Sequence, residues 1–178
     1  MRMRALLLPL MLVAALAACG EARNMDGQAI AAAPPRLLGQ YKAVSETARE
    51  ALGDVGVERA GLIFSSGVAL YTRTLEPRRG GDATARDGLS YAALAVGASD
   101  LQVELRRIID VANADALCGA DAPTYVALVH QARTSAFTLL LFAGAEPPGP
   151  HSTQSRLCAS YAYAAPHGAR THEGVVLW

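Results

Sequence analysis

Residues 123–144, PTYVALVHQARTSAFTLLLFAG, decide the fold of this chain. Two apolar runs, 123–131 and 136–144, are rich in β-branched and aromatic residues, which are enriched in β-strands. The polar residues ARTS at 132–135 separate the two runs and are typical of a turn. The stretch therefore predicts an antiparallel hairpin of two well-buried strands.

Other short runs of the β type lie on both sides of this hairpin. Two runs flank Ser65-Ser66-Gly67 and predict a second hairpin. The alternating residues of 156–164, RLCASYAYA, predict another strand. Residues 98–111 fit either a helix or a strand. We expect a strand because the segments on both sides, including the short apolar segment 90–96, are expected to be strands and because Asp100-Leu101 follows a Gly-Ala-Ser turn cluster. The apolar residues 175–178 either add a last strand or pack on the sheet.

One short helix is predicted at 46–52. Ser45 is a suitable N-cap and Gly53 a suitable C-terminal stop. The competing interpretation is that the strand over 39–45 continues through this segment. Seven to nine short strands with one or two short helices indicate a mainly β domain over 36–178. We expect a small antiparallel barrel or sandwich, and a barrel first, because closure removes exposed strand edges.

The N-terminus has the pattern of an export signal. Arg2 and Arg4 precede an apolar run over 5–16. That run is too short for a membrane-spanning helix, which needs roughly 20 residues. Residues 1–18 are therefore predicted to be a signal peptide that is removed from the mature protein.

The residues that end this segment, Leu16-Ala17-Ala18-Cys19, resemble the lipobox of bacterial lipoproteins. The resemblance implies cleavage before Cys19, lipidation of its thiol, and anchoring of the protein to a membrane of the cell envelope. Glycine at position 20 favours the outer membrane, facing the periplasm. Residues 19–35, which end in two prolines, are then the lipidated cysteine and a flexible tether. The alternative is an ordinary signal peptide that leaves Cys19 as a free thiol.

Cys118 and Cys158 are the two remaining cysteines. Export would place them in a compartment that permits disulfides, where an even pair most simply forms one bridge. Such a bridge would contribute roughly 4 kcal/mol in the chain-entropy model. Two buried free thiols or a redox pair are the alternatives, but redox pairs usually have C-x-x-C spacing.

The charge of the chain argues against nucleic-acid binding. The 178 residues carry 16 basic and 16 acidic side chains, and removal of residues 1–18 leaves 14 basic against 16 acidic. A body with this balance has no electrostatic reason to bind nucleic acid. The expected partners are the membrane through Cys19, and an unidentified periplasmic protein or a small apolar ligand.

The sequence has few signs of catalytic or metal chemistry. It contains no G-x-S-x-G, H-E-x-x-H, Walker or G-x-G-x-x-G motif. His167 and His172 are weak candidates for metal ligands, and His130 is expected to be a half-buried strand residue. We expect no catalytic residue, no metal and no cofactor.

Four carboxylates and five tyrosines are the other groups that chemistry could use. An acid–base pair could come from Asp54, Glu58, Glu104 and Asp110, but nothing in the sequence brings two of them together. The tyrosines on β-type segments are expected to pack in the core or an interface. They are Tyr71, Tyr91, Tyr125, Tyr161 and Tyr163.

The segment 37–45, LLGQYKAVS, loosely resembles the start of lipocalin-type barrels. Small lysozyme-inhibitor lipoproteins of bacteria share the plan of lipobox, small barrel and one disulfide. Ser65-Ser66-Gly67 is too short a match to transfer a functional residue from them. The sequence therefore predicts a non-enzymatic envelope lipoprotein that acts as a binding or structural module. The alternatives are an inhibitor of a cell-wall hydrolase and an enzyme without a known motif.

Overall fold

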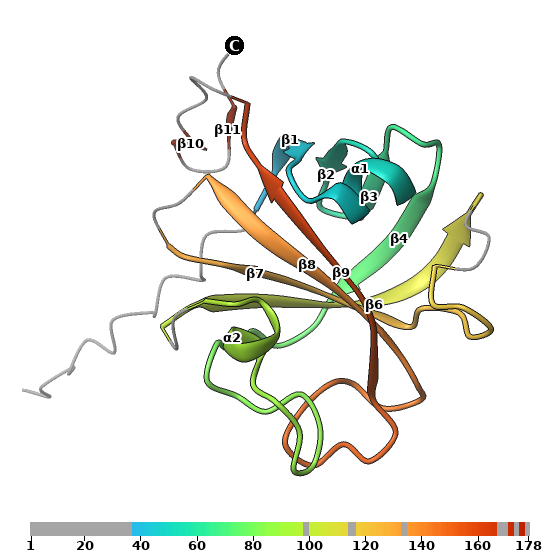
Figure 1. The fold of residues 1–178 in the computed structure, drawn as a ribbon, viewed down its shortest axis with the longest axis vertical. Helices are drawn as coiled ribbons and strands as arrows, with labels where there is room; N and C mark the ends of the chain where they lie inside the picture. Colours follow the sequence, from blue (N-terminus) through green and yellow to red (C-terminus); the bar gives the residue numbers. More distant parts are fainter. Residues whose placement is uncertain are drawn as a thin grey trace, which may run out of the picture. The chain divides into compact units, whose positions relative to one another are not determined.

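The computed structural model describes residues 37–97, 100–113, 117–132 and 135–166, and the backbone of 171–172 and 175–176 (Figure 1). The predicted signal peptide, Cys19 and the whole predicted tether lie outside the described residues. Among the described residues, no helix has the length and apolar character needed to cross a bilayer.

A nine-stranded antiparallel sheet forms the body of the protein, and eight of its strands close into a barrel. The strands are β1 (Gly39–Ala43), β2 (Val55–Val57), β3 (Gly61–Phe64), β4 (Ala69–Thr74), β5 (Arg78–Arg79), β6 (Gln102–Ala112), β7 (Tyr125–His130), β8 (Ala136–Ala143) and β9 (Arg156–Ala164). Pairing of β1 with β9 and of β4 with β6 closes the ring, and β5 is an extra strand beside the first residues of β6. The prediction of a small, mainly β barrel is confirmed.

The barrel is an up-and-down arrangement because each strand pairs with its neighbours in the sequence, apart from β5. The hairpin predicted over 123–144 is confirmed as β7 and β8, in which Val126 faces Leu141 and Leu128 faces Leu139. These four side chains point inward and are fully buried, as the alternation of a strand requires. The hairpin around Ser65-Ser66-Gly67 is also confirmed, as β3 and β4.

Aromatic side chains fill one part of the barrel interior. The Tyr41 and Phe137 rings meet edge to face with centroids 4.9 Å apart, and the Phe137 and Tyr163 rings stack at 5.3 Å. Phe64 lies 6.4 Å from Tyr163. All four side chains are buried, so this part of the barrel is packed with protein.

Helix α1 (Glu46–Ala51) packs at one end of the barrel (Figure 1). Ser45 Oγ accepts a hydrogen bond from the backbone N–H of Ala48, which is the capping contact predicted for this residue. Ala48 and Leu52 are fully buried in the same core as the interior of the barrel. The predicted short helix is confirmed.

Helix α2 (Tyr91–Leu94) corrects our interpretation of 90–96 as a strand. Ser90 Oγ accepts from the backbone N–H of Ala93, and an alanine-rich segment of this length suits one helical turn. The segment that carries α2 covers the outer side of β6, β7 and β8, where Tyr91 packs with Phe142 and other residues of a second buried cluster. Residues 98–111 are a strand as expected, and they form most of β6.

The two ends of the barrel differ in what they carry. At the end that we call the loop end lie the connections 113–124 and 144–155, which meet at the start of β9. Helix α1 lies beside the last residues of β9, since Lys42 pairs with Ala164 and Ser45 Oγ accepts from the backbone N–H of Ala162. The predicted last strand is present in part, as the backbone of β11 (Val175–Val176) pairs with β10 (Thr171–His172) and not with the barrel sheet.

Candidate functional site at the loop end

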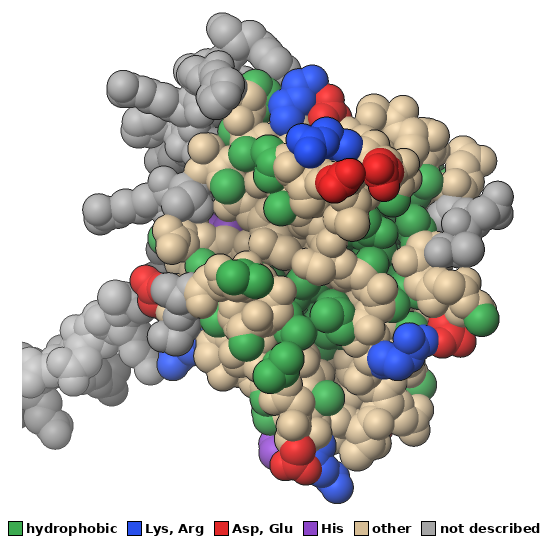
Figure 2. All heavy atoms as spheres, viewed as in Figure 1, with side chains coloured by type: hydrophobic (Ala, Val, Ile, Leu, Met, Phe, Trp, Pro, Cys, Tyr) green, Lys and Arg blue, Asp and Glu red, His purple; other side chains and the backbone are tan. Residues whose placement is uncertain are grey.

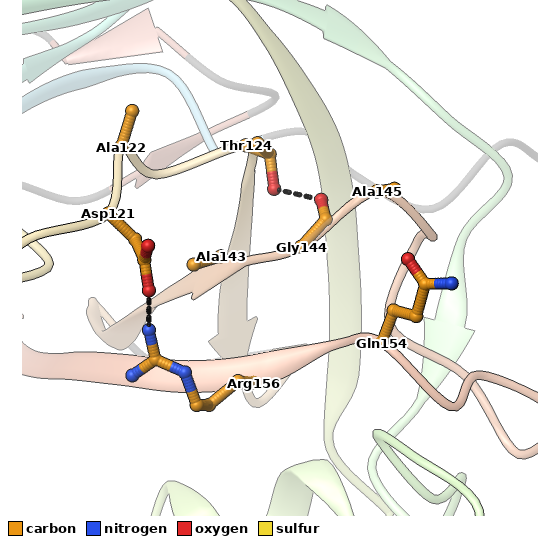
Figure 3. A pocket seen from close by; sticks show the side chains of 8 residues that line it. All are labelled: Asp121, Ala122, Thr124, Ala143, Gly144, Ala145, Gln154 and Arg156. Atoms are coloured by element: carbon orange, nitrogen blue, oxygen red, sulfur yellow. Dashed lines mark hydrogen bonds and ion pairs between the residues drawn. The ribbon is translucent and has the colours of Figure 1, made fainter.

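A pocket of about 480 Å³ opens at the loop end, where β7 begins, β8 ends and β9 begins (Figure 3). Asp121 and Arg156 face each other on one side of it, and Gln154 lies on the other side. Small residues line the space between them, which leaves room for a ligand group. The complete lining is Asp121, Ala122, Thr124, Ala143, Gly144, Ala145, Gln154 and Arg156.

Two links fix the 118–121 turn to the start of β9. Cys118 and Cys158 form a disulfide with their Cα atoms 5.0 Å apart, as the sequence predicted. Asp121 pairs with Arg156, and the two links lie only a few residues from each other on both segments. The wall of the pocket is thus held covalently and by charge, and a preorganised wall loses less entropy when a ligand binds.

The remaining walls are fixed by hydrogen bonds to the β8–β9 connection. Thr124 Oγ donates to the carbonyl of Gly144 at 2.7 Å, and Tyr125 OH donates to the carbonyl of Ala145 at 3.0 Å. Gly144 has φ of 123°, and a Cβ there would collide with the backbone carbonyl of Gln154. Only glycine allows the chain to cross itself so closely at this rim.

Glu146 holds the far side of the same connection. Its carboxylate accepts from the backbone N–H of Thr153 at 2.8 Å and from Ser152 Oγ at 3.3 Å. These hydrogen bonds, chiefly the one from Thr153, lower the pKa of the Glu146 carboxyl. Glu146 therefore stays ionised and keeps the connection closed at neutral pH.

The chemistry of the pocket suits polar recognition. A guanidinium has five N–H donors, and Arg156 uses one nitrogen for Asp121. No other described residue takes its remaining donors, so they can bind a ligand carboxylate or phosphate. The Gln154 amide can both donate and accept. About 60% of each side chain in the Asp121–Arg156 pair is solvent-exposed, so a ligand can reach and replace one partner.

A second polar group lies inside the barrel, on β6. Arg106 is completely buried, and its Nε donates to Glu104 Oε1 at 3.0 Å. The same guanidinium donates to the carbonyl of Glu58 at 2.7 Å and approaches Thr72 Oγ at 3.5 Å. This buried ion pair ties the β2–β3 turn to β6, and removal of either charge would leave the other uncompensated.

His130 lies near this ion pair, opposite Gln102 on the neighbouring strand. Its Nδ1 is 3.1 Å from the Gln131 carbonyl, and burial lowers the pKa of the imidazole despite that contact and the nearby Glu104 charge. His130 is therefore neutral at physiological pH. Glu104 also raises the pKa of Tyr41, after the larger effect of burial.

The residues proposed from the sequence for metal or catalysis do not gather in one site. Asp54 pairs with Lys42 at 2.6 Å, Glu104 pairs with Arg106, and Glu58 and Asp110 are exposed. Within the part of the chain that the structure describes, no three His, Cys, Asp or Glu side chains form a group suited to a metal ion. Cys19 and His167 lie outside the described residues, and only the backbone of His172 is described.

The predicted tyrosines are mostly core residues. Tyr91, Tyr125, Tyr161 and Tyr163 are buried, whereas Tyr71 is half exposed on the outer face. Burial raises the pKa of Tyr91, Tyr161 and Tyr163.

Sequence reasoning did not identify the residues of the pocket. Asp121 follows Cys118 by three positions and Arg156 precedes Cys158 by two, so proximity to the predicted disulfide was the available signal. Gln154 gave no signal, because it lies in a proline-rich connection whose path depends on the fold.

Comparisons with family models, with curated proteins and with solved structures found no match to this chain. The structure therefore defines its class by architecture alone, as a small closed antiparallel β-barrel with a disulfide at its loop end.

Proposed function

We propose that the protein is a lipid-anchored lipoprotein of the bacterial envelope, and that its barrel is a non-enzymatic binding module. The observation that carries the proposal is the pocket at the loop end, whose wall is held by the Cys118–Cys158 disulfide and the Asp121–Arg156 pair. A module built to bind needs a fixed, solvent-accessible recognition surface, and this pocket has both properties.

The interior of the barrel supports a binding surface at the rim. Lipocalin-type barrels hold ligands inside, but here aromatic rings pack one part of the interior and the Glu104–Arg106 pair occupies another. The polar lining of the loop-end pocket favours a polar group of a periplasmic partner as its ligand. The anchor is supported by the resemblance of Leu16-Ala17-Ala18-Cys19 to a lipobox.

Photo-cross-linking in intact cells tests the binding module. A photoreactive amino acid replaces Gln154 at the pocket, and in a control chain it replaces Gln40, which is exposed on the outer wall at β1. We expect a discrete adduct from position 154 that is weakened by Arg156→Gln and by loss of the disulfide. Equal labelling from both positions, or labelling from 154 that ignores both changes, would contradict the proposal.

A second candidate is inhibition of a cell-wall hydrolase, and the eight-stranded barrel with one disulfide is the observation that favours it. This support is an analogy of architecture. Addition of the purified mature protein to a lysozyme lysis assay decides the question. Inhibition at micromolar protein would support it, and unchanged lysis would remove it.

A further inference from the structure

The outer wall of the barrel carries an exposed apolar group on β3, β4 and β6. We call Ile63, Tyr71 and Ile109 the outer patch. Their exposed fractions are 49%, 47% and 65%. The register places Gly61 opposite Tyr71, which puts Ile63 one pleat away on the same face. Ile109 sits at the β-bulge beside Tyr71 on the other side of β4. The three side chains therefore form one surface across three neighbouring strands.

Two arginines lie directly beside the outer patch. Arg73 and Arg107 are cross-strand partners on β4 and β6, and both are exposed on the same outer face as Tyr71. Like charges placed directly opposite each other in a sheet are destabilising. No carboxylate of the described residues forms an ion pair with either guanidinium. The fold thus keeps two adjacent positive charges without an internal partner.

The rest of the outer wall differs from this region. The α2 segment covers the outer side of β7, β8 and the first half of β6. The uncovered outer wall at β9 and β1 carries small or polar residues such as Ser160 and Gln40, and the exposed Lys42 there is paired with Asp54. On the face drawn in Figure 2, basic side chains at the top, right and bottom lie next to acidic ones. The β3–β4–β6 face therefore differs from the rest of the outer wall, because it combines exposed apolar side chains with two neighbouring arginines that have no ion-pair partner among the described residues.

We propose that the outer patch, with Arg73 and Arg107, binds an acidic segment of a partner protein. The guanidinium pair can hold one or two carboxylates through bidentate hydrogen bonds, while Ile63, Tyr71 and Ile109 contact aliphatic side chains of the same segment. This surface is separate from the loop-end pocket, and the proposal does not depend on the function of that pocket.

The charged residues beside the outer patch favour an acidic segment over two other occupants, a bilayer and a second copy of the chain. Asp110 lies opposite Tyr71 and is exposed; beneath a bilayer its carboxylate would lose its water, which costs free energy, whereas beside a single peptide segment bound at Arg73 and Arg107 it can stay in water. If the face bound a second copy of the chain, the three apolar side chains of each copy would bury far less surface than the roughly 800 Å² per side that a stable interface needs. A carboxylate-bearing segment instead neutralises the arginines and covers the apolar residues together.

Site-specific cross-linking of the full chain in cells tests this proposal. A photoreactive amino acid replaces Ile63, and the adduct is sequenced by mass spectrometry. We expect a protein adduct whose cross-linked peptide contains at least two Asp or Glu residues. Combined Arg73→Glu and Arg107→Glu should lower its yield by about tenfold, which corresponds to about 1.4 kcal/mol. The matched control is Arg49→Glu, an exposed arginine on α1 and not on the strands of the patch, which should not change the yield.

Other outcomes overturn the proposal. These are a lipid adduct, an adduct with a second copy of the chain, a peptide without acidic residues, no adduct at all, or a yield that the two arginine changes leave intact. A thermal melt of each variant shows that it is folded, because Arg73 and Arg107 are exposed and their replacement should shift the melting temperature little. The adduct from Ile63 is read separately from that at Gln154, so failure here leaves the loop-end result unaffected.

Discussion

The interior of the barrel and its loop end use polar side chains in opposite ways. Inside, Arg106 is fully buried and its guanidinium contacts a carboxylate, a backbone carbonyl and a hydroxyl of the protein itself. At the loop end, Arg156 contacts only Asp121 among the described residues and is largely exposed beside a pocket. The first arginine is committed to the fold, whereas the second has donors left for a ligand. The difference is consistent with our proposal that the interior stabilises the protein while the rim binds a partner.

The largest expected effect comes from breaking the interior ion pair. Arg106→Met leaves Glu104 buried without its partner and should lower the free energy of unfolding by about 3–5 kcal/mol. Urea denaturation of the mature protein in detergent measures the change. The double variant Glu104→Leu, Arg106→Met should be much closer to the parent, since it leaves neither charge unpaired. Equal losses in the single and double variants would show that the charge pairing is unimportant.

Loss of the disulfide should have the next largest effect and should act at the rim. Cys118→Ser with Cys158→Ser is expected to lower the free energy of unfolding by about 2–4 kcal/mol. Hydrogen exchange should increase at 117–124 and 154–158 and change little in β7 and β8. Uniform loss of protection across the barrel would mean that the bridge holds the whole fold and not only the loop end.

The α1 cap should have an intermediate effect. Ser45 Oγ accepts from the backbone N–H groups of Ala48 and Ala162, so Ser45→Ala removes the cap of α1 and a contact that joins it to β9. We expect a loss of about 1–2 kcal/mol, measured by urea denaturation. The control is Ser66→Ala in the exposed β3–β4 turn, which should change stability by less than about 0.5 kcal/mol. Equal effects of the two substitutions would argue against the capping contact.

Acid should weaken the contact of Asp54 with β1. Hydrogen bonds, first from Lys42 and then from the backbone N–H of Ala43, lower the pKa of Asp54 in the folded state. The stabilisation is therefore complete above the ordinary carboxyl pKa of 3.8 and is lost as the pH falls through the lower folded value. Stability measured from pH 6 to pH 2 should decline less in Asp54→Asn than in the parent. Parallel curves would contradict this assignment.

The smallest stability effect is expected at the pocket itself. Arg156→Gln removes an exposed ion pair and should change the free energy of unfolding by less than about 1 kcal/mol. The same substitution should greatly reduce cross-linking from Gln154. A variant that is strongly destabilised, or that binds normally, would break the proposed division between interior and rim.

The sequence predicted the parts of the fold that depend on local patterns. Alternation and turn residues located the 123–144 hairpin, and Ser45 located the start of α1. The helix at α2 was missed because a four-residue alanine-rich helix and a short apolar strand have the same composition.

The orientation of β6 could not be predicted from its pattern. Gln102, Glu104 and Arg106 alternate with Val103 and Leu105, so the strand looks as if its charged side faces water. In the structure the charged side faces inward and the apolar side lies under the α2 segment. The position of that covering segment depends on contacts between distant residues. For the same reason the pocket, which two separate connections and the adjoining strand ends build, was not visible in the sequence.

Peptide mapping of the mature protein, purified from its native membrane without reductant, tests the central claim that a membrane-anchored barrel has a disulfide-fixed binding rim. We predict one linked peptide that joins Cys118 to Cys158, and an N-terminal peptide that begins at Cys19 and carries acyl chains. Free thiols at Cys118 and Cys158, a bridge from Cys19 to either of them, or an unmodified Cys19 would contradict the account.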